Sequence, residues 1–224
     1  MATGRPAGIL DHPYYYDAAK IVTGLGKGFA LDSIYFKPYA CCRWIHSALN
    51  GLCRLVEEHS FEPTDILSIE VHTFERILRL NNYPDPENLE SAQYSAPFCL
   101  ATATVEGKKG LLPMRESLLN RPDIVTLANR ISLRVEPEFE RMFPEHTAAR
   151  VIIQTATERF EAVCDHPLGD PANPMDWIML VDKSHHLTKG LLPTARQEEV
   201  IKAVQSLPNL GLSPLLDCLA EPLS

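Results

Sequence analysis

The stretch of sequence that decides the fold is residues 41–73, CCRWIHSALNGLCRLVEEHSFEPTDILSIEVHT. Apolar residues recur at helical spacing through its first half, which predicts a helix from about Cys42 to Glu58; the stripe consists of Ile45, Ala48/Leu49, Leu52 and Leu55/Val56. Its second half alternates apolar with polar residues and predicts a strand over 66–73. A helix followed directly by a strand favours a mixed α+β fold.

Outward from this stretch, further helices and strands are predicted up to about residue 165. Ser95 is expected to cap a helix over about 97–106, which Gly107 ends. Other patterns predict a short helix at 122–128, a strand at 131–136, and a hairpin of two strands at 150–155 and 159–164. About four strands with flanking helices predict an α+β domain over 33–165.

The two ends of the chain are expected to differ from this domain. Residues 1–32 show no pattern of an independent fold and are interpreted as a lead-in segment. Residues 166–224 are predicted to be a helical tail, with helices at 175–184, 194–207 and 214–219. Thr194 and Gln197 have the spacing of a capping box at the start of the middle helix.

Composition excludes some classes of protein. A net charge of −8 argues against a general nucleic-acid binder. The six cysteines form no CxxC pair, which disfavours a zinc site and indicates a reducing compartment. No secretory signal pattern is present at the start, and no apolar run approaches the roughly 18–20 residues that cross a bilayer. We therefore expect a cytoplasmic protein without a membrane partner, and leave a mitochondrial location open.

One segment stands out chemically, because residues 33–56 contain no acidic residue in an otherwise acidic chain. The same segment carries four basic residues: Lys37, Arg43, His46 and Arg54. A helix start beside a lysine and an arginine can bind a carboxylate, and a histidine there can act as an acid or base. The alternative is a solvated basic face of a surface helix. No pattern of histidines at ligand spacing indicates a metal site.

Three motifs together resemble the MmgE/PrpD family. FKPYACCRWIHSALNGL at 36–52 resembles the family signature KPYPCCRxxHxAIDA. The family signature is followed by a passage from helix to strand, which residues 65–74, DILSIEVHTF, resemble. The family segment AxxSxxYxxAxALxxG is similar to residues 91–108, SAQYSAPFCLATATVEGK. The order and spacing of all three agree, and a looser resemblance extends to the C-terminus.

The resemblance implies a fold and a class of chemistry. The family includes 2-methylcitrate dehydratase, cis-aconitate decarboxylase and iminodisuccinate epimerase, which act on small di- or tricarboxylates, in most members without a metal or organic cofactor. Its members have a large all-helical domain and a smaller α+β lid, with the active site between them. By this resemblance, 33–165 is the lid and 166–224 returns to the helical domain.

Family members are about twice as long as this chain, and their principal catalytic histidines lie in the helical half. We therefore expect a chain that is incomplete as an enzyme. Its expected partners are a small polycarboxylate and either a second copy of itself or a chain that supplies the helical half.

The resemblance also assigns roles to particular residues. Lys37 matches the lysine that faces the substrate carboxylates, and His46 matches the histidine nine positions later; both are candidate catalytic residues. The candidate substrate-binding residues are Lys37, Cys42, Arg43, Ser95 and Phe98. Two positions depart from the family pattern, because Phe98 stands where many members have tyrosine and Ala40 replaces the second proline of KPYP.

The expected activity is that of a lyase, a dehydratase or decarboxylase acting on a citrate-like acid. One alternative is an isomerase or epimerase that uses the same proton abstraction without elimination. Another is a catalytically inactive partner subunit that retains the lid fold.

Overall fold

The computed structural model describes residues 17–60 and 62–220, and its contacts divide the chain into two units, residues 1–35 and 36–224. The described part of the first unit contains the short helix α1 (Ala18–Val22), which Asp17 caps, and a 3₁₀ turn at Ala30–Ser33. Every residue from 19 to 35 is exposed. The described residues of the lead-in thus form short helical turns without a buried core. Its proposed limit at residue 32 and the limit at 165 remain predictions.

The α+β part of the second unit contains five α-helices and four strands within its described residues. In chain order they are α2 (His46–His59), β1 (Ser68–Thr73), α3 (Leu89–Gln93), α4 (Ala96–Glu106), α5 (Pro122–Ala128), β2 (Ile131–Val135), α6 (Pro137–Met142), β3 (Ala149–Gln154) and β4 (Arg159–Cys164).

The four strands form one mixed sheet in the order β2-β1-β3-β4. β1 pairs with β2 in parallel, while the β1–β3 and β3–β4 pairs are antiparallel. The parallel pair requires a long crossover, and α3, α4 and α5 occupy it. The predicted α+β class with four strands is confirmed.

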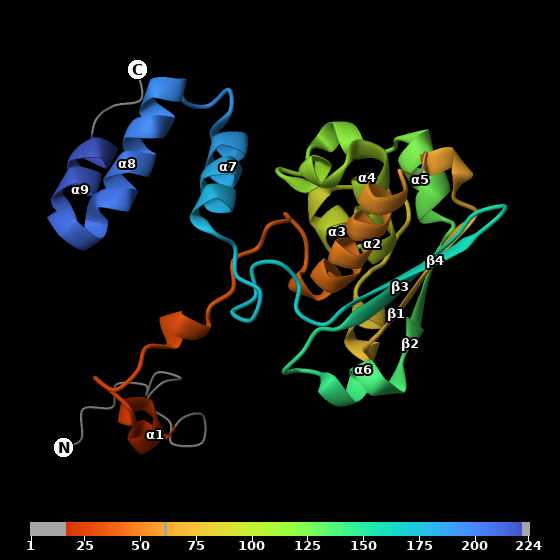
Figure 1. Ribbon diagram of the computed structural model, residues 1–224, viewed down its shortest axis with the longest axis horizontal. Helices are drawn as coiled ribbons and strands as arrows, with labels where there is room; N and C mark the ends of the chain where they lie inside the picture. Colours follow the sequence, from red (N-terminus) through yellow and green to blue (C-terminus); the bar gives the residue numbers. More distant parts are fainter. Residues whose placement is uncertain (1–16, 61, 221–224) are drawn as a thin grey trace, which may run out of the picture. The chain divides into compact units, whose positions relative to one another are not determined.

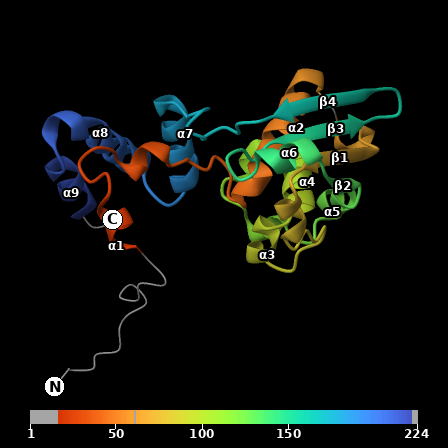
Figure 2. The same cartoon turned by 90° about the horizontal axis from the view of Figure 1, so that it is seen from below.

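One face of the sheet packs on helices. Ile69 and Val71 of β1 point to this face and are fully buried, as their alternation with polar neighbours predicts. α2 contacts β3 and β4 and runs alongside them in both views (Figure 1 and Figure 2). Gly51 lets α2 approach closely, since a Cβ there would lie 3.3 Å from the Val151 side chain. α4, buried along most of its length, packs between α2 and α5.

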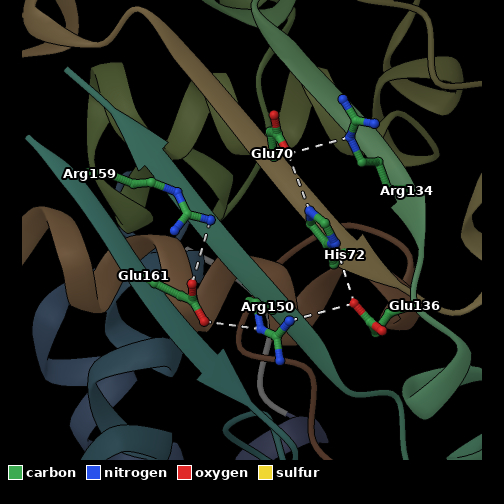
Figure 3. Close-up of polar contacts among 7 residues, drawn as sticks. All are labelled: Glu70, His72, Arg134, Glu136, Arg150, Arg159 and Glu161. Carbon is green, nitrogen blue, oxygen red and sulfur yellow. Dashed lines mark hydrogen bonds and ion pairs between the residues drawn. The ribbon is translucent and has the colours of Figure 1, made fainter. Parts of the chain in front are cut away.

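The other face of the sheet carries a chain of ion pairs across all four strands (Figure 3). His72 lies between two carboxylates, 3.2 Å from Glu70 and 3.5 Å from Glu136. Acidic and basic side chains alternate from one edge of the sheet to the other, in the order Arg134, Glu70, His72, Glu136, Arg150, Glu161 and Arg159. Their charges are nearly balanced, so this face is a solvated surface rather than a basic or acidic patch.

The start of α2 differs from the sequence prediction. A 3₁₀ turn at Arg43–Ile45 precedes the α-helix, which begins at His46 rather than near Cys42. The interpretation of a solvated basic helix face is wrong for Arg43 and His46, because both are buried. Helical periodicity places Arg43 opposite the apolar stripe, but the loop over residues 166–173 reaches it through Asp170.

The tail is helical as predicted, with α7 (Trp177–Thr188), α8 (Thr194–Leu210) and α9 (Ser213–Ala220). The predicted capping box is wrong, because Pro193 occupies the cap position and α8 has no side-chain cap. Gln197 is instead hydrogen-bonded to His185 Nδ1 at 2.8 Å and donates to the Leu192 carbonyl at 2.9 Å. Over the part of the chain that is described, no helix is both long and apolar enough to cross a membrane.

Candidate active site

Backbone hydrogen bonds fix the loop that carries Lys37. Three backbone N–H groups of the segment donate to carbonyls in three separate parts of the chain: Phe36 N to Gly169 O at 2.8 Å, Ala40 N to Leu111 O at 2.8 Å, and Cys42 N to Gln93 O at 2.9 Å. The loop is therefore positioned by the surrounding fold and has little freedom of its own.

Gly169 is required where the loop meets residues 166–173. Its φ is +88°, a conformation that residues with a side chain rarely adopt, and a Cβ there would lie 1.9 Å from the Phe36 carbonyl oxygen. The absence of a side chain at this position allows the two backbones to pair directly.

Arg43, a candidate carboxylate ligand, already binds a carboxylate of its own chain. Its Nη2 atom lies 2.8 Å from Asp170 Oδ2, and the two side chains are 9% and 26% exposed. This pair ties the loop over residues 166–173 to the start of α2. A substrate contact by Arg43 stays a prediction, and it would require the guanidinium to share or exchange Asp170.

Removing Asp170 tests this structural role. We expect Asp170→Ala to lower the free energy of unfolding by about 1.5–3 kcal/mol, because it takes a charged partner from a buried guanidinium. Asp182→Ala is the matched control: its carboxylate is exposed, 4.0 Å from Lys109, and its loss should change stability by no more than about 0.5 kcal/mol. Urea denaturation of both variants measures the difference, and equal effects would contradict the assignment.

His46 has no exposed surface, so it is neither a surface histidine nor accessible to a solute in this structure. Its ring lies edge-on to the Tyr39 ring, with the centroids 5.3 Å apart. Neither ring nitrogen makes a hydrogen bond of ordinary geometry to a described residue, but the ring lies close enough to the Cys41 thiol to help lower the pKa of that thiol. His46 therefore packs against the Lys37 loop through the Tyr39 ring. A catalytic role of His46 stays a prediction.

Two thiols lie beside this histidine. Burial alone would raise the pKa of Cys41, but the neighbouring Cys99 and His46 side chains and the positive charge of Lys37 bring that pKa below its ordinary value. Burial and the neighbouring Cys41 raise the pKa of Cys99 well above its ordinary value. Sequence reasoning missed Cys41, whose only signal was its place between Lys37 and His46.

Ser95 and Phe98 have structural positions at the start of α4. The Ser95 hydroxyl accepts a hydrogen bond from Phe98 N at 3.2 Å and donates to the Tyr83 carbonyl at 2.6 Å. Both residues are fully buried. The predicted N-cap is confirmed, whereas a substrate contact by either side chain would require α4 to shift and stays a prediction.

Lys37 and Cys42 are the candidates that solvent reaches. Lys37 is exposed, and Cys42 is half-buried, with burial raising the pKa of its thiol. The backbone carbonyl of Lys37 accepts a hydrogen bond of 2.7 Å from Lys183 Nζ on α7. Across residues 17–60 and 62–220, no three His, Cys, Asp or Glu side chains gather as they would around a metal ion.

Comparison with known proteins decides the family. The profile of the MmgE/PrpD C-terminal domain matches residues 39–209, which is well over half of the chain. The chain belongs to the MmgE/PrpD family. The match contains Cys42, Arg43, His46 and the α4 residues, and it begins two residues after Lys37.

Two curated members of the MmgE/PrpD family are similar to this chain. Both are named cis-aconitate decarboxylase, one from Aspergillus terreus strain NIH 2624 / FGSC A1156 and one from Aspergillus terreus. Each is 25% identical over an alignment that covers 92% of this chain and 44% of the relative. The chain thus spans less than half the length of the MmgE/PrpD proteins it matches.

Proposed function

We propose that this chain forms the carboxylate-binding lid of a lyase that removes water or carbon dioxide from a small citrate-like di- or tricarboxylate. The observation that carries the proposal is Lys37, an exposed lysine on a loop fixed by the surrounding fold. No carboxylate of the described residues lies within ion-pair distance of its ammonium group. The similarity to two cis-aconitate decarboxylases supports the same class of substrate.

Loss of water or carbon dioxide from a polycarboxylate is favoured by a fixed positive charge in the active site. Losing carbon dioxide or a proton from such an acid leaves an electron pair on carbon, which delocalises into a neighbouring carboxylate as an enolate-like intermediate. A lysine at that carboxylate stabilises the charge that develops, and a positioned acid or base moves the proton. In this proposal Lys37 binds and stabilises the carboxylate, and buried His46 holds the loop that presents it.

A non-catalytic partner subunit is the second candidate, favoured by the complete burial of His46. This burial leaves the candidate histidine without contact to a solute. The reaction products distinguish a lyase from an isomerase or epimerase, because an epimerase would return an isomer of its substrate without release of water or carbon dioxide.

Binding by the Lys37 loop can be tested with two single substitutions. Lys37→Ala should weaken binding of a citrate-like tricarboxylate about ten- to a hundredfold, the effect of one lost charged hydrogen bond. Arg54→Ala should change binding little, because Arg54 lies eleven residues beyond Arg43, roughly 16 Å along the helix axis. Isothermal titration of both variants against the unmodified chain measures the difference. Equal and small effects would rule out the Lys37 loop as the site.

We also propose that the helical tail binds a protein partner. The tail exposes large apolar side chains, among them Ile178, Leu191, Leu210, Leu212, Leu216 and Leu219. Four apolar side chains of α8 are partly covered: Val200, Ile201, Val204 and Leu207. Exposed apolar patches of this kind usually bind another surface.

We therefore expect the purified chain to self-associate or to bind a chain that supplies the helical half. Multi-angle light scattering should give a mass above 25.1 kDa, or else the chain should bind an apolar dye strongly. A clean monomer that binds no such dye would contradict the expectation.

A further inference from the structure

A cavity beside the Lys37 loop contains basic side chains that the family resemblance does not assign. Its volume is about 270 Å³, and it lies between the loop and α7. Pro38 and Tyr39 line it from the loop, Met175 and Met179 line it near the start of α7, and Lys183 reaches it from the next turn of that helix. The cavity thus joins an apolar wall to an ammonium group.

Lys183 is held at this cavity by its hydrogen bond to the Lys37 carbonyl, 2.7 Å long, which leaves two of its N–H donors for other partners. Its side chain is partly buried. Burial is the main cause that lowers the pKa of Lys183, and the positive charge of Lys37 is the second cause. Lys37 does not itself line the cavity, but Lys183 Nζ lies at its backbone carbonyl, and the Lys37 charge is close enough to contribute to the lowered pKa of Lys183.

The other charged groups at the cavity are already paired. Lys108 lies 2.7 Å from Glu57, and Lys109 lies 4.0 Å from Asp182. Within the described residues, by contrast, neither Lys37 nor Lys183 has a carboxylate within ion-pair distance. Two neighbouring positive charges without a counter-charge repel each other, and a doubly charged anion would relieve this repulsion.

We propose that Lys183 of α7 and Lys37 together form a two-ammonium site for a small polycarboxylate, with Met175 and Met179 packing against its carbon chain. This inference rests on the proposed function and adds a substrate-binding residue from the tail to it. The cavity is slightly smaller than the usual range of about 300–1,000 Å³ for sites of drug-sized ligands, which suits a smaller acid of about six carbons. Two separated ammonium groups match two carboxylates of one molecule better than a single-centred anion.

Titration calorimetry of the full chain tests the site, with propane-1,2,3-tricarboxylate as the probe because it has neither a hydroxyl group nor a double bond to react. Lys183→Met should weaken binding about ten- to a hundredfold. Lys183→Arg, which keeps the charge, should stay within about threefold of the unmodified chain. Lys189→Met removes an exposed lysine just beyond the end of α7 and should leave affinity unchanged. Circular dichroism checks that each variant is folded.

A second readout follows Lys183 itself. With ¹³C at the lysine Cε, the pH midpoint of the Lys183 resonance should rise when the tricarboxylate is added, because bound anion stabilises the charged form. A midpoint that does not move would contradict direct contact. Butyrate and inorganic phosphate serve as ligand controls, and we expect both to bind far more weakly. Phosphate binding with equal affinity and the same dependence on Lys183 would overturn the assignment to polycarboxylates.

The outcomes separate the two proposals. If Lys37→Ala weakens binding and Lys183→Met does not, the two-ammonium site is wrong and the proposed function stands. If binding depends on Lys183 but no lyase turnover appears once a helical half is supplied, the site stands and the proposed function is wrong. If the unmodified chain binds no tricarboxylate at millimolar concentration, both fail.

Discussion

The 224-residue chain on its own should convert none of cis-aconitate, citrate and 2-methylcitrate above the uncatalysed rate. It covers 44% of each decarboxylase that it resembles, and His46, the histidine at the site, is buried. If Lys37 binds the substrate carboxylate while His46 stays buried, the substrate would be held without His46 moving its proton.

Absorbance of the unsaturated acids, together with release of carbon dioxide, measures this turnover. The control is the unmodified full-length decarboxylase under the same conditions, which shows that the assay detects the reaction. Robust turnover by the 224-residue chain would contradict the prediction. It would also mean that the Lys37 region contains a complete active site.

Phe98→Ala should destabilise the chain by about 3–5 kcal/mol, the usual cost of deleting a buried aromatic ring. Phe98 is fully buried on α4, so its loss opens a cavity between that helix and its neighbours. Urea denaturation measures the change, and Phe98→Leu, which keeps more of the volume, should cost considerably less.

The control for this substitution is Tyr94→Ala, which removes an exposed aromatic ring just before the same helix. We expect it to change stability by about 0.5 kcal/mol or less. If Phe98→Ala left stability intact and instead weakened tricarboxylate binding, Phe98 would be a substrate contact as the family resemblance implies.

Local signals made much of the fold predictable from sequence. The helix at Pro122–Ala128 has the predicted bounds, because a proline in the first turn and an apolar stripe specify it without help from distant residues. Ser95 caps α4 for the same reason, since its hydroxyl accepts from Phe98 N three positions away. The strands were predictable from an alternation that the buried face of the sheet enforces.

The candidate site was less predictable, because contacts distant in sequence determine it. Arg43 and Asp170 are 127 positions apart, and Lys37 and Lys183 are 146 apart. Periodicity placed Arg43 opposite the buried stripe of α2, where it would be solvated in an isolated helix. The loop over residues 166–173 covers it instead, and no local pattern reveals which segment returns to cover a helix.

Lys37 is proposed to serve a lyase acting on a citrate-like acid. The most direct test is the turnover of cis-aconitate and 2-methylcitrate by this chain once the helical half of a family member is joined to it or mixed with it. We predict turnover with release of carbon dioxide or water, and a loss of at least about tenfold when Lys37 is replaced by alanine. Turnover that is unchanged in Lys37→Ala, or no turnover by a folded complex of the two halves, would contradict it.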